Sequence, residues 1–196
     1  MSAVVRWWPP VGLAGLVLLG LLVGKGSTPV DDWFQTLGVT HPDLGLLLFF
    51  TDGRVTLTLC GIVAAVAVFQ RRWRLAAATV ITPFLAVMAA RLAKRSFGRL
   101  KEGAVCYPSG HTTLALVVIA MAVLLVGATV WAVAVASVVL VLAAVGQAVS
   151  YHYFTDVIGA WFLGSAMVCL AIWVARLDRC QPRRRSASHS SLAWNS

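Results

Sequence analysis

Six long apolar segments constrain the fold of this chain more than any other feature of its sequence. A helix needs roughly 20 predominantly apolar residues to cross the hydrocarbon core of a bilayer. Of the 196 residues, 60% are hydrophobic and 12% are charged, about half the charged fraction of a soluble domain. The sequence therefore predicts an all-α integral membrane bundle of six transmembrane helices, over residues 11–24, 55–69, 75–92, 112–130, 132–149 and 157–174.

The segment between the first two predicted spans, residues 26–53, has a mixed pattern. Acidic residues such as Asp31 and Asp43 are separated there by apolar pairs such as Trp33-Phe34. This pattern is typical of a helix in the membrane interface, and Thr51-Asp52-Gly53 is a turn signal. We therefore expect an interfacial helix in the first outer loop, and not a full span.

The arginines at the ends of the apolar segments predict the orientation of the chain. A cytoplasmic N-terminus places Arg6, the basic run 71–74 and the basic tail inside, as the positive-inside rule requires. We expect residues 1–176 to form one six-span domain in the plasma membrane and residues 177–196 to be a disordered, Ser-rich cytoplasmic tail. A signal peptide is the alternative for the first segment, but Lys25-Gly26-Ser27-Thr28 is a poor cleavage site.

One basic stretch falls on the opposite, outer face. Four cations lie within residues 94–101, and Pro108-Ser109-Gly110-His111 follows them. Basic groups, a glycine amide and a serine hydroxyl can share the oxygens of a phosphoryl group as its charge shifts during transfer. The alternatives are that the cations snorkel to lipid headgroups and that Pro-Ser-Gly-His is only a turn and a helix cap.

A second histidine is predicted to reach the same membrane face. Two predicted spans separate His111 from His152, and two crossings return the chain to the face that it left. Asp156 follows His152 by four residues, so on one helix face its carboxylate can accept the Nδ1 proton and leave Nε2 free to attack an electrophile. Asp156 can also cap the last predicted helix, and the two roles are compatible.

These motifs, in this order, resemble those of the type 2 phosphatidic acid phosphatase family, whose relatives include vanadium haloperoxidases and bacterial acid phosphatases. That family carries Lys-x6-Arg-Pro, then Pro-Ser-Gly-His, then Ser-Arg-x5-His-x3-Asp. The second motif is intact at residues 108–111, and the third is half present as His152-x3-Asp156. The first is altered, because Lys94-x6 leads to Lys101-Glu102 in place of Arg-Pro.

The resemblance implies a role for each matching residue. His152 would be the nucleophile that forms a phosphohistidine, Asp156 would orient it, and His111 would protonate the leaving group. No metal or other cofactor is implied, and the sequence has no clustered carboxylates to hold one. The residues implied to bind the phosphate are Lys94, Lys101, Ser109 and Gly110.

The third motif departs from the family at its arginine. The Ser-Arg pair would fall at positions 145 and 146, where this chain has Val145-Gly146, so a phosphate-binding arginine is missing. Arg99 and Gln147 are the candidate replacements. If position 146 is the arginine site, Gly146→Arg is expected to improve phosphate binding or turnover.

We therefore expect a metal-independent lipid phosphatase that hydrolyses a phosphomonoester or diphosphate of an isoprenoid or glycerolipid at the outer membrane face. A polyprenyl phosphate of a bacterial envelope is one candidate substrate. The alternative is a degenerate relative that binds phospholipid headgroups as a carrier, scaffold or regulator. The expected partners are the lipid substrate and the bilayer. Nucleic acid is not expected despite the net charge of +9, because most basic residues flank apolar segments.

Overall fold

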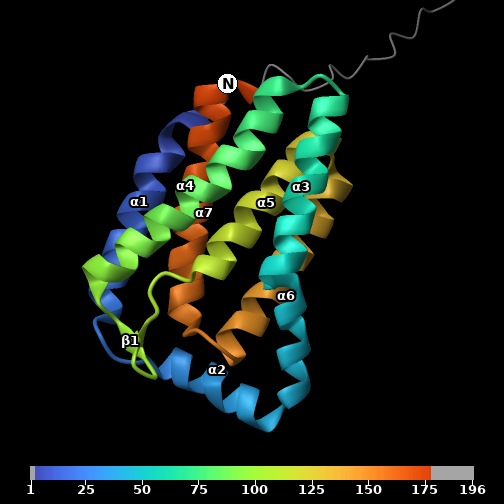
Figure 1. The fold of residues 1–196 in the computed structure, drawn as a ribbon. Helices are drawn as coiled ribbons and strands as arrows, with labels where there is room; N and C mark the ends of the chain where they lie inside the picture. The colour runs from blue at the N-terminus through green and yellow to red at the C-terminus, as the bar shows by residue number, and fades with distance from the viewer. Residues whose placement is uncertain (1–2, 178–196) are drawn as a thin grey trace, which may run out of the picture.

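The computed structural model describes residues 3–177, which form a bundle of helices with one short hairpin (Figure 1). The hairpin pairs Leu100 with Val105 and Lys101 with Ala104 in antiparallel register. The elements in chain order are α1 (Ala3–Val23), α2 (Pro29–Thr40), the 3-10 helix η1 (Pro42–Thr51), α3 (Gly53–Phe69), α4 (Trp73–Phe97), β1 (Leu100–Lys101), β2 (Ala104–Val105), α5 (Gly110–Val126), α6 (Val130–Val149) and α7 (Phe154–Ala175).

The long helices follow the predicted apolar segments. Each of the six segments falls largely within one of α1, α3, α4, α5, α6 and α7. Among the described residues, five helical segments are long and apolar enough to cross a membrane, and α5, with 17 residues, is shorter. The chain is therefore a multi-pass helical membrane protein, and the number of six spans remains a prediction.

Two boundaries differ from the sequence-based expectation. α1 begins at Ala3, well before residue 11, because Pro9 and Pro10 are accommodated inside the helix, as membrane helices allow. Between α1 and α3, α2 forms where an interfacial helix was predicted, but η1 continues into α3. Pro42–Phe69 is consequently one apolar segment of 28 residues that could itself span.

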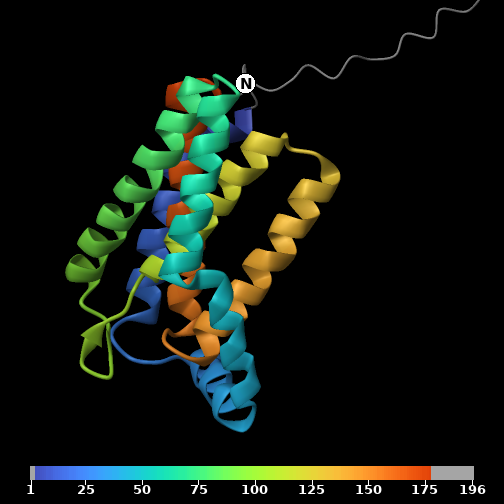
Figure 2. The ribbon, with the colours of Figure 1, turned by 45° about the vertical axis from the view of Figure 1, so that its right-hand side comes forward.

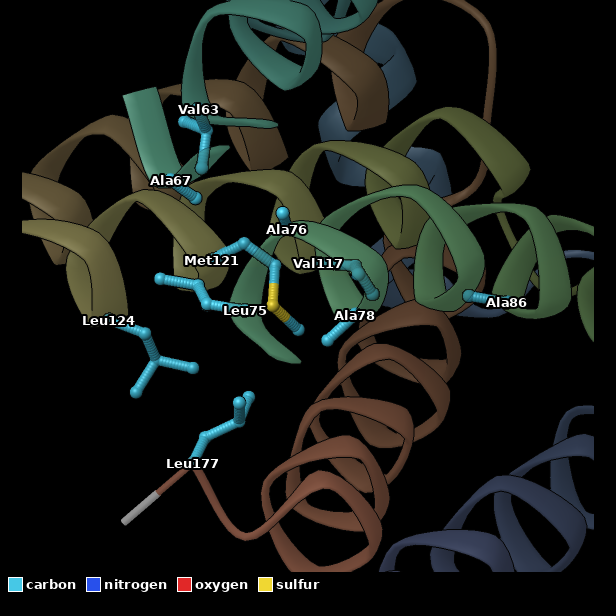
Figure 3. Close-up of a cluster of buried hydrophobic side chains, with 10 residues drawn as sticks. All are labelled: Val63, Ala67, Leu75, Ala76, Ala78, Ala86, Val117, Met121, Leu124 and Leu177. Carbon is cyan, nitrogen blue, oxygen red and sulfur yellow. The ribbon is translucent and has the colours of Figure 1, made fainter. Parts of the chain in front are cut away.

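The main hydrophobic cluster lies near the end of the bundle where α3 is joined to α4 (Figure 3). Several of its members are alanines, and small residues let membrane helices approach closely enough for van der Waals packing. Leu177, the first residue of the predicted tail, is buried in this cluster, while residues 178–196 lie outside the described part. The members are Val63, Ala67, Leu75, Ala76, Ala78, Ala86, Val117, Met121, Leu124 and Leu177.

The opposite end of the bundle gathers the polar motifs. α2 lies across this end, and the β1–β2 hairpin lies beside it (Figures 1 and 2). α4 ends at Phe97 and is capped by Gly98, whose left-handed backbone (φ 61°) suits a glycine and turns the chain into the hairpin. The loop between α6 and α7, residues 150–153, also lies at this end.

Candidate active site

His152 and Asp156 meet at the start of α7. The helix begins at Phe154, so His152 lies in the preceding turn and not on the helix face that was predicted to hold it. The contact still forms, with His152 Nδ1 3.4 Å from Asp156 Oδ2, and Tyr153 N donates to the same oxygen at 3.1 Å. Asp156 thus caps α7 and holds the Nδ1 side of His152, which leaves Nε2 available.

The surroundings of His152 favour a neutral imidazole. The residue is 7% exposed. Burial lowers the pKa of His152 below its usual value of 6.5, the hydrogen bond with Asp156 works in the opposite direction, and the charges of Lys94 and His111 add to the lowering. At neutral pH the ring is therefore uncharged, which is the form that a nucleophilic nitrogen needs.

Ser109 joins the Pro-Ser-Gly-His motif to this pair. Its backbone N donates to the Asp156 carbonyl oxygen at 3.1 Å. Its Oγ accepts from Thr112 N at 3.4 Å and from Thr112 Oγ1 at 3.0 Å, so the side chain caps α5. The first amides of α5, beginning with Gly110, have no intrahelical acceptor, and the positive end of the helix dipole favours an anion there. The capping role and the phosphate-binding role are compatible.

His111 lines a polar pocket of about 540 Å³ between α5, α6 and η1. The side chain is exposed, and it is near enough to His152 for its charge to influence the pKa of that residue. The two imidazoles therefore lie at the same end of the bundle. The other lining residues are Leu48, Phe49, Thr51, Asp52, Gly53, Gln147 and Tyr151.

Lys94 lies in the last turn of α4, close enough to His152 to influence its pKa. Its Nζ donates to the Val105 carbonyl oxygen at 3.3 Å. An ammonium group has three N–H donors, so this contact leaves donors for a phosphoryl oxygen. Lys94 is thus placed where the resemblance implies a phosphate-binding cation.

Lys101 is less available than Lys94. Its Nζ donates to Gln35 Oε1 at 2.7 Å and to the Ser150 carbonyl oxygen at 3.0 Å. Burial lowers the pKa of Lys101, and the Glu102 carboxylate is the first of several charges that oppose this. Glu102 itself is exposed in the hairpin turn and takes no part in the His152 contacts.

Arg99 is not placed as a replacement for the missing phosphate-binding arginine. Its side chain is fully buried. Nη1 donates to Asp156 Oδ1 and Nη2 donates to Asp31 Oδ2, each at 2.7 Å. Nε and Nη2 also donate to the Gly26 carbonyl oxygen, and Nη1 donates to Thr155 Oγ1. The five N–H groups of the guanidinium are all used, so it has no donor left for a phosphate.

Asp31, which the sequence did not indicate as a site residue, is fully buried at the start of α2. Its Oδ1 accepts from Thr155 N at 2.9 Å, and its Oδ2 accepts from Arg99. Burial by itself would raise the pKa of Asp31, but the hydrogen bonds from Thr155, Arg99 and Thr28 outweigh it and lower the pKa. Asp31 is therefore an ionised, buried partner of Arg99.

Gln35 lies one helical turn after Asp31 and was missed as well. Its Nε2 donates to the Ala148 carbonyl oxygen at 2.6 Å and to the His152 carbonyl oxygen at 3.1 Å. Spacing by four residues places Asp31 and Gln35 on one face of α2. That spacing is the only signal in the sequence that could have linked the two residues.

Position 146, where the family motif has its arginine, is closely packed against η1. A Cβ on Gly146 would lie 2.7 Å from Leu47 C and 2.8 Å from Leu48 N, so position 146 faces the backbone of η1. The expectation that Gly146→Arg improves binding therefore conflicts with the packing of α6. Gln147 is buried, its Nε2 donates to Thr51 Oγ1 at 2.7 Å, and its Oε1 has no partner within residues 3–177. Gln147 therefore offers the pocket an acceptor and not a cation.

No group of three or more His, Cys, Asp or Glu side chains that could hold a metal ion occurs in the described part of the chain.

Comparison with known proteins identifies the fold. No model of a protein family matches the sequence, and a search of curated proteins finds no similar sequence. The fold is nevertheless that of a PAP2-type membrane phosphatase, PAP2 being type 2 phosphatidic acid phosphatase. The chain is similar to the crystal structure described as the first transmembrane PAP2 type phosphatidylglycerolphosphate phosphatase from Bacillus subtilis. The TM-score is 0.71 and the identity 18%, over 91% of this chain and 100% of that chain. The resemblance of the chain to this family is thereby confirmed at the level of the fold.

Proposed function

We propose that this chain is a lipid phosphatase that hydrolyses the phosphomonoester or diphosphate of a glycerolipid or isoprenoid at the outer membrane face. The hydrogen bond from Ser109 N to the Asp156 carbonyl carries this proposal, because it places the N-terminus of α5 beside the His152–Asp156 pair. An anion-binding helix end and a neutral imidazole are then parts of one site. The outer face follows from the arginine distribution of the sequence.

The first step is the transfer of the phosphoryl group to His152. The Nε2 lone pair attacks phosphorus, the bond between phosphorus and the lipid oxygen breaks, and His111 gives its proton to the departing oxygen. Asp156 stabilises the cationic ring that forms on His152, since its Oδ2 faces Nδ1. Lys94, Ser109 and the Gly110 amide hold the phosphoryl oxygens.

The second step is hydrolysis of the phosphohistidine. His111 is now neutral and takes a proton from a water molecule, whose oxygen attacks phosphorus. The bond between phosphorus and Nε2 breaks, and its electron pair returns to His152. Inorganic phosphate leaves, and both histidines are again in their starting protonation states.

The lipid nature of the substrate rests on the position of the site. The site lies at one end of a bundle of apolar helices, where a lipid phosphate can reach it with its tail still in the bilayer. The structural neighbour's own substrate, phosphatidylglycerolphosphate, belongs to the glycerolipid class. The orphan Gln147 Oε1 needs a hydrogen donor, which a headgroup hydroxyl or a protonated phosphate oxygen can supply.

The test is phosphate release by the purified protein from phosphatidylglycerolphosphate, phosphatidic acid, a polyprenyl phosphate and a polyprenyl diphosphate. His152→Asn should abolish release from whichever lipid the wild type cleaves. His41→Asn is the matched control, because His41 is exposed at the end of α2 and should keep full activity. Equal activity in wild type and His152→Asn would contradict the proposal.

A headgroup-binding protein without turnover is the second candidate. It is favoured by the guanidinium of Arg99, which is fully engaged, and by the packing that excludes an arginine at position 146. Lipid-phosphate binding by wild type and His152→Asn alike, with no phosphate released by either from any lipid of the panel, would establish this alternative.

A further inference from the structure

A chain of buried contacts runs from α2 to the candidate nucleophile. Asp31 Oδ2 pairs with Arg99 Nη2, Arg99 Nη1 pairs with Asp156 Oδ1, and Asp156 Oδ2 faces His152 Nδ1. The first two contacts are 2.7 Å long, and the side chains of Asp31, Arg99 and Asp156 are fully buried. The two carboxylate oxygens of Asp156 are thus divided, with one held by Arg99 and the other turned to the imidazole.

The charges of Asp31, Arg99 and Asp156 in this series of contacts depend on one another. Asp31 and Asp156 bind the two terminal nitrogens of the same guanidinium, so they are near neighbours. Two buried carboxylates close together with no cation between them would share a proton, because they cannot both stay charged. A protonated Asp156 could then no longer serve as the charged acceptor for the Nδ1 proton of His152. Arg99 prevents this by compensating both charges.

α2 also holds the backbone on the other side of the nucleophile. Gln35 donates to the His152 carbonyl oxygen, while Asp31 accepts from Thr155 N. His152 itself and Thr155, three residues later, are therefore both held by one face of α2. Arg99 stacks on the Tyr153 ring, with its Cζ 4.4 Å from the ring centroid, which further limits its movement.

We propose that Arg99 is a positioning residue which Asp31 holds in place, and that it keeps Asp156 as a charged acceptor turned to Nδ1 of His152. This role rests on the proposed function for its catalytic meaning, since the proposed reaction needs the Nδ1–H tautomer with Nε2 free. The outer-loop helix α2 thereby controls the state of a nucleophile on a different, distant segment of the chain. Asp31 and Arg99 act as a unit.

The test measures the tautomer and the titration of His152 by nitrogen-15 NMR of histidine-labelled protein in detergent, without any substrate. The wild type should show the Nδ1–H tautomer. Arg99→Gln should lose it, because Asp31 and Asp156 then share a proton. The double variant Asp31→Asn, Arg99→Gln should regain it, because the competing carboxylate is gone. Recovery in the double variant separates this role from a purely structural one.

The charges that act on His152 make the single variant Asp31→Asn informative too. His152 is faced by Asp156 from α7, Lys94 from α4 and His111 from α5, with Arg99 and Asp31 behind Asp156. Removing the negative charge of Asp31 while Arg99 stays should keep the tautomer and lower the pKa of His152 further. Should Arg99→Gln fail to fold, Asp31→Asn and Arg99→Lys decide the question, since both retain a cation and must retain the Nδ1–H tautomer.

An unchanged tautomer in Arg99→Gln, or an unchanged His152 titration in Asp31→Asn, would overturn the proposal. The readout is independent of turnover. If the lipid panel showed no phosphate release while the NMR results held, the proposed function would fail and the positioning role of Arg99 would stand.

Discussion

Gly146 offers the sharpest prediction about how α6 is held against η1. A Cβ at this position would approach Leu47 C to 2.7 Å, Leu48 N to 2.8 Å and Leu47 Cβ to 2.9 Å. Two of these three atoms are backbone, so relief requires α6 and η1 to separate, and no side chain can simply rotate away. η1 also carries Thr51, which accepts a hydrogen bond from Gln147 in the candidate site.

The magnitude for Gly146→Ala follows from two opposing effects. Overpacking in a close contact costs roughly 1–3 kcal/mol, while alanine is favoured over glycine inside a helix by roughly 0.5–1 kcal/mol. The net loss should be about 0.5–2 kcal/mol, which corresponds to a fall in Tm of roughly 1–8 °C for a chain of this size. Thermal unfolding in detergent, followed by tryptophan fluorescence at one fixed scan rate, measures it.

Gly61→Ala is the matched control, because Gly61 lies inside α3 with nothing within 4 Å of an added Cβ. That variant should keep or slightly raise the Tm. Gly146→Arg should lose more stability than Gly146→Ala and gain no turnover. A stable Gly146→Arg protein with improved phosphate binding or turnover would refute this description and would restore position 146 as the arginine site.

Two further predictions concern the chemistry of the site. Burial lowers the pKa of His152 below 6.5, and only the neutral ring attacks. The value of kcat/KM should therefore stay high as pH falls through 6.5 and should drop at lower pH, where the ring takes a proton. A pH profile with its acid limb at or above 6.5 would contradict this. Lys94→Ala should lower kcat/KM roughly 10- to 100-fold through the loss of one charge-assisted contact. Arg91 is an exposed cation on the same helix, and Arg91→Ala should leave kcat/KM unchanged. Equal losses in the two variants would indicate a general effect of surface charge.

The helices and the two-histidine site were largely accessible from the sequence. Apolar run length decides which segments become long helices in a membrane protein, so the six segments could be located from composition alone. Counting two crossings between His111 and His152 placed both at the same end of the bundle, where the structure also has them. The four-residue separation of His152 and Asp156 made their contact foreseeable, although the turn before α7 produces it.

The support of the site could not be foreseen from local patterns. Asp31 and Asp32 are adjacent acids with similar neighbours, yet only Asp31 is buried, and its partner Arg99 lies 68 positions further along the chain. Arg99 stands in a basic cluster, where exposure to headgroups or phosphate is the ordinary expectation. Its burial depends on the position of α2 across the end of the bundle, which is a tertiary feature.

The function of Gly146 was hidden for a related reason. Apart from Gln147, its neighbours in sequence are apolar helix residues, and the pattern of α6 does not reveal which face meets η1. Only the approach of the Leu47–Leu48 backbone shows that a side chain is excluded there. At the motif position where the family has an arginine, this chain therefore has a glycine whose side-chain space is occupied by the backbone of η1.

Detection of a phosphorylated His152 tests the proposed mechanism most directly. The protein is mixed with an aryl phosphate, whose leaving group needs little help from a general acid, and is quenched in alkali, where phosphohistidine survives. Peptide mass spectrometry then locates the phosphoryl group in wild type, His111→Ala and His152→Asn. Phosphorylation is expected at His152, with more of it in His111→Ala because the water step is slowed, and none in His152→Asn. Turnover with no phosphorylated His152 in either the wild type or His111→Ala, or phosphorylation of a different residue, would contradict it.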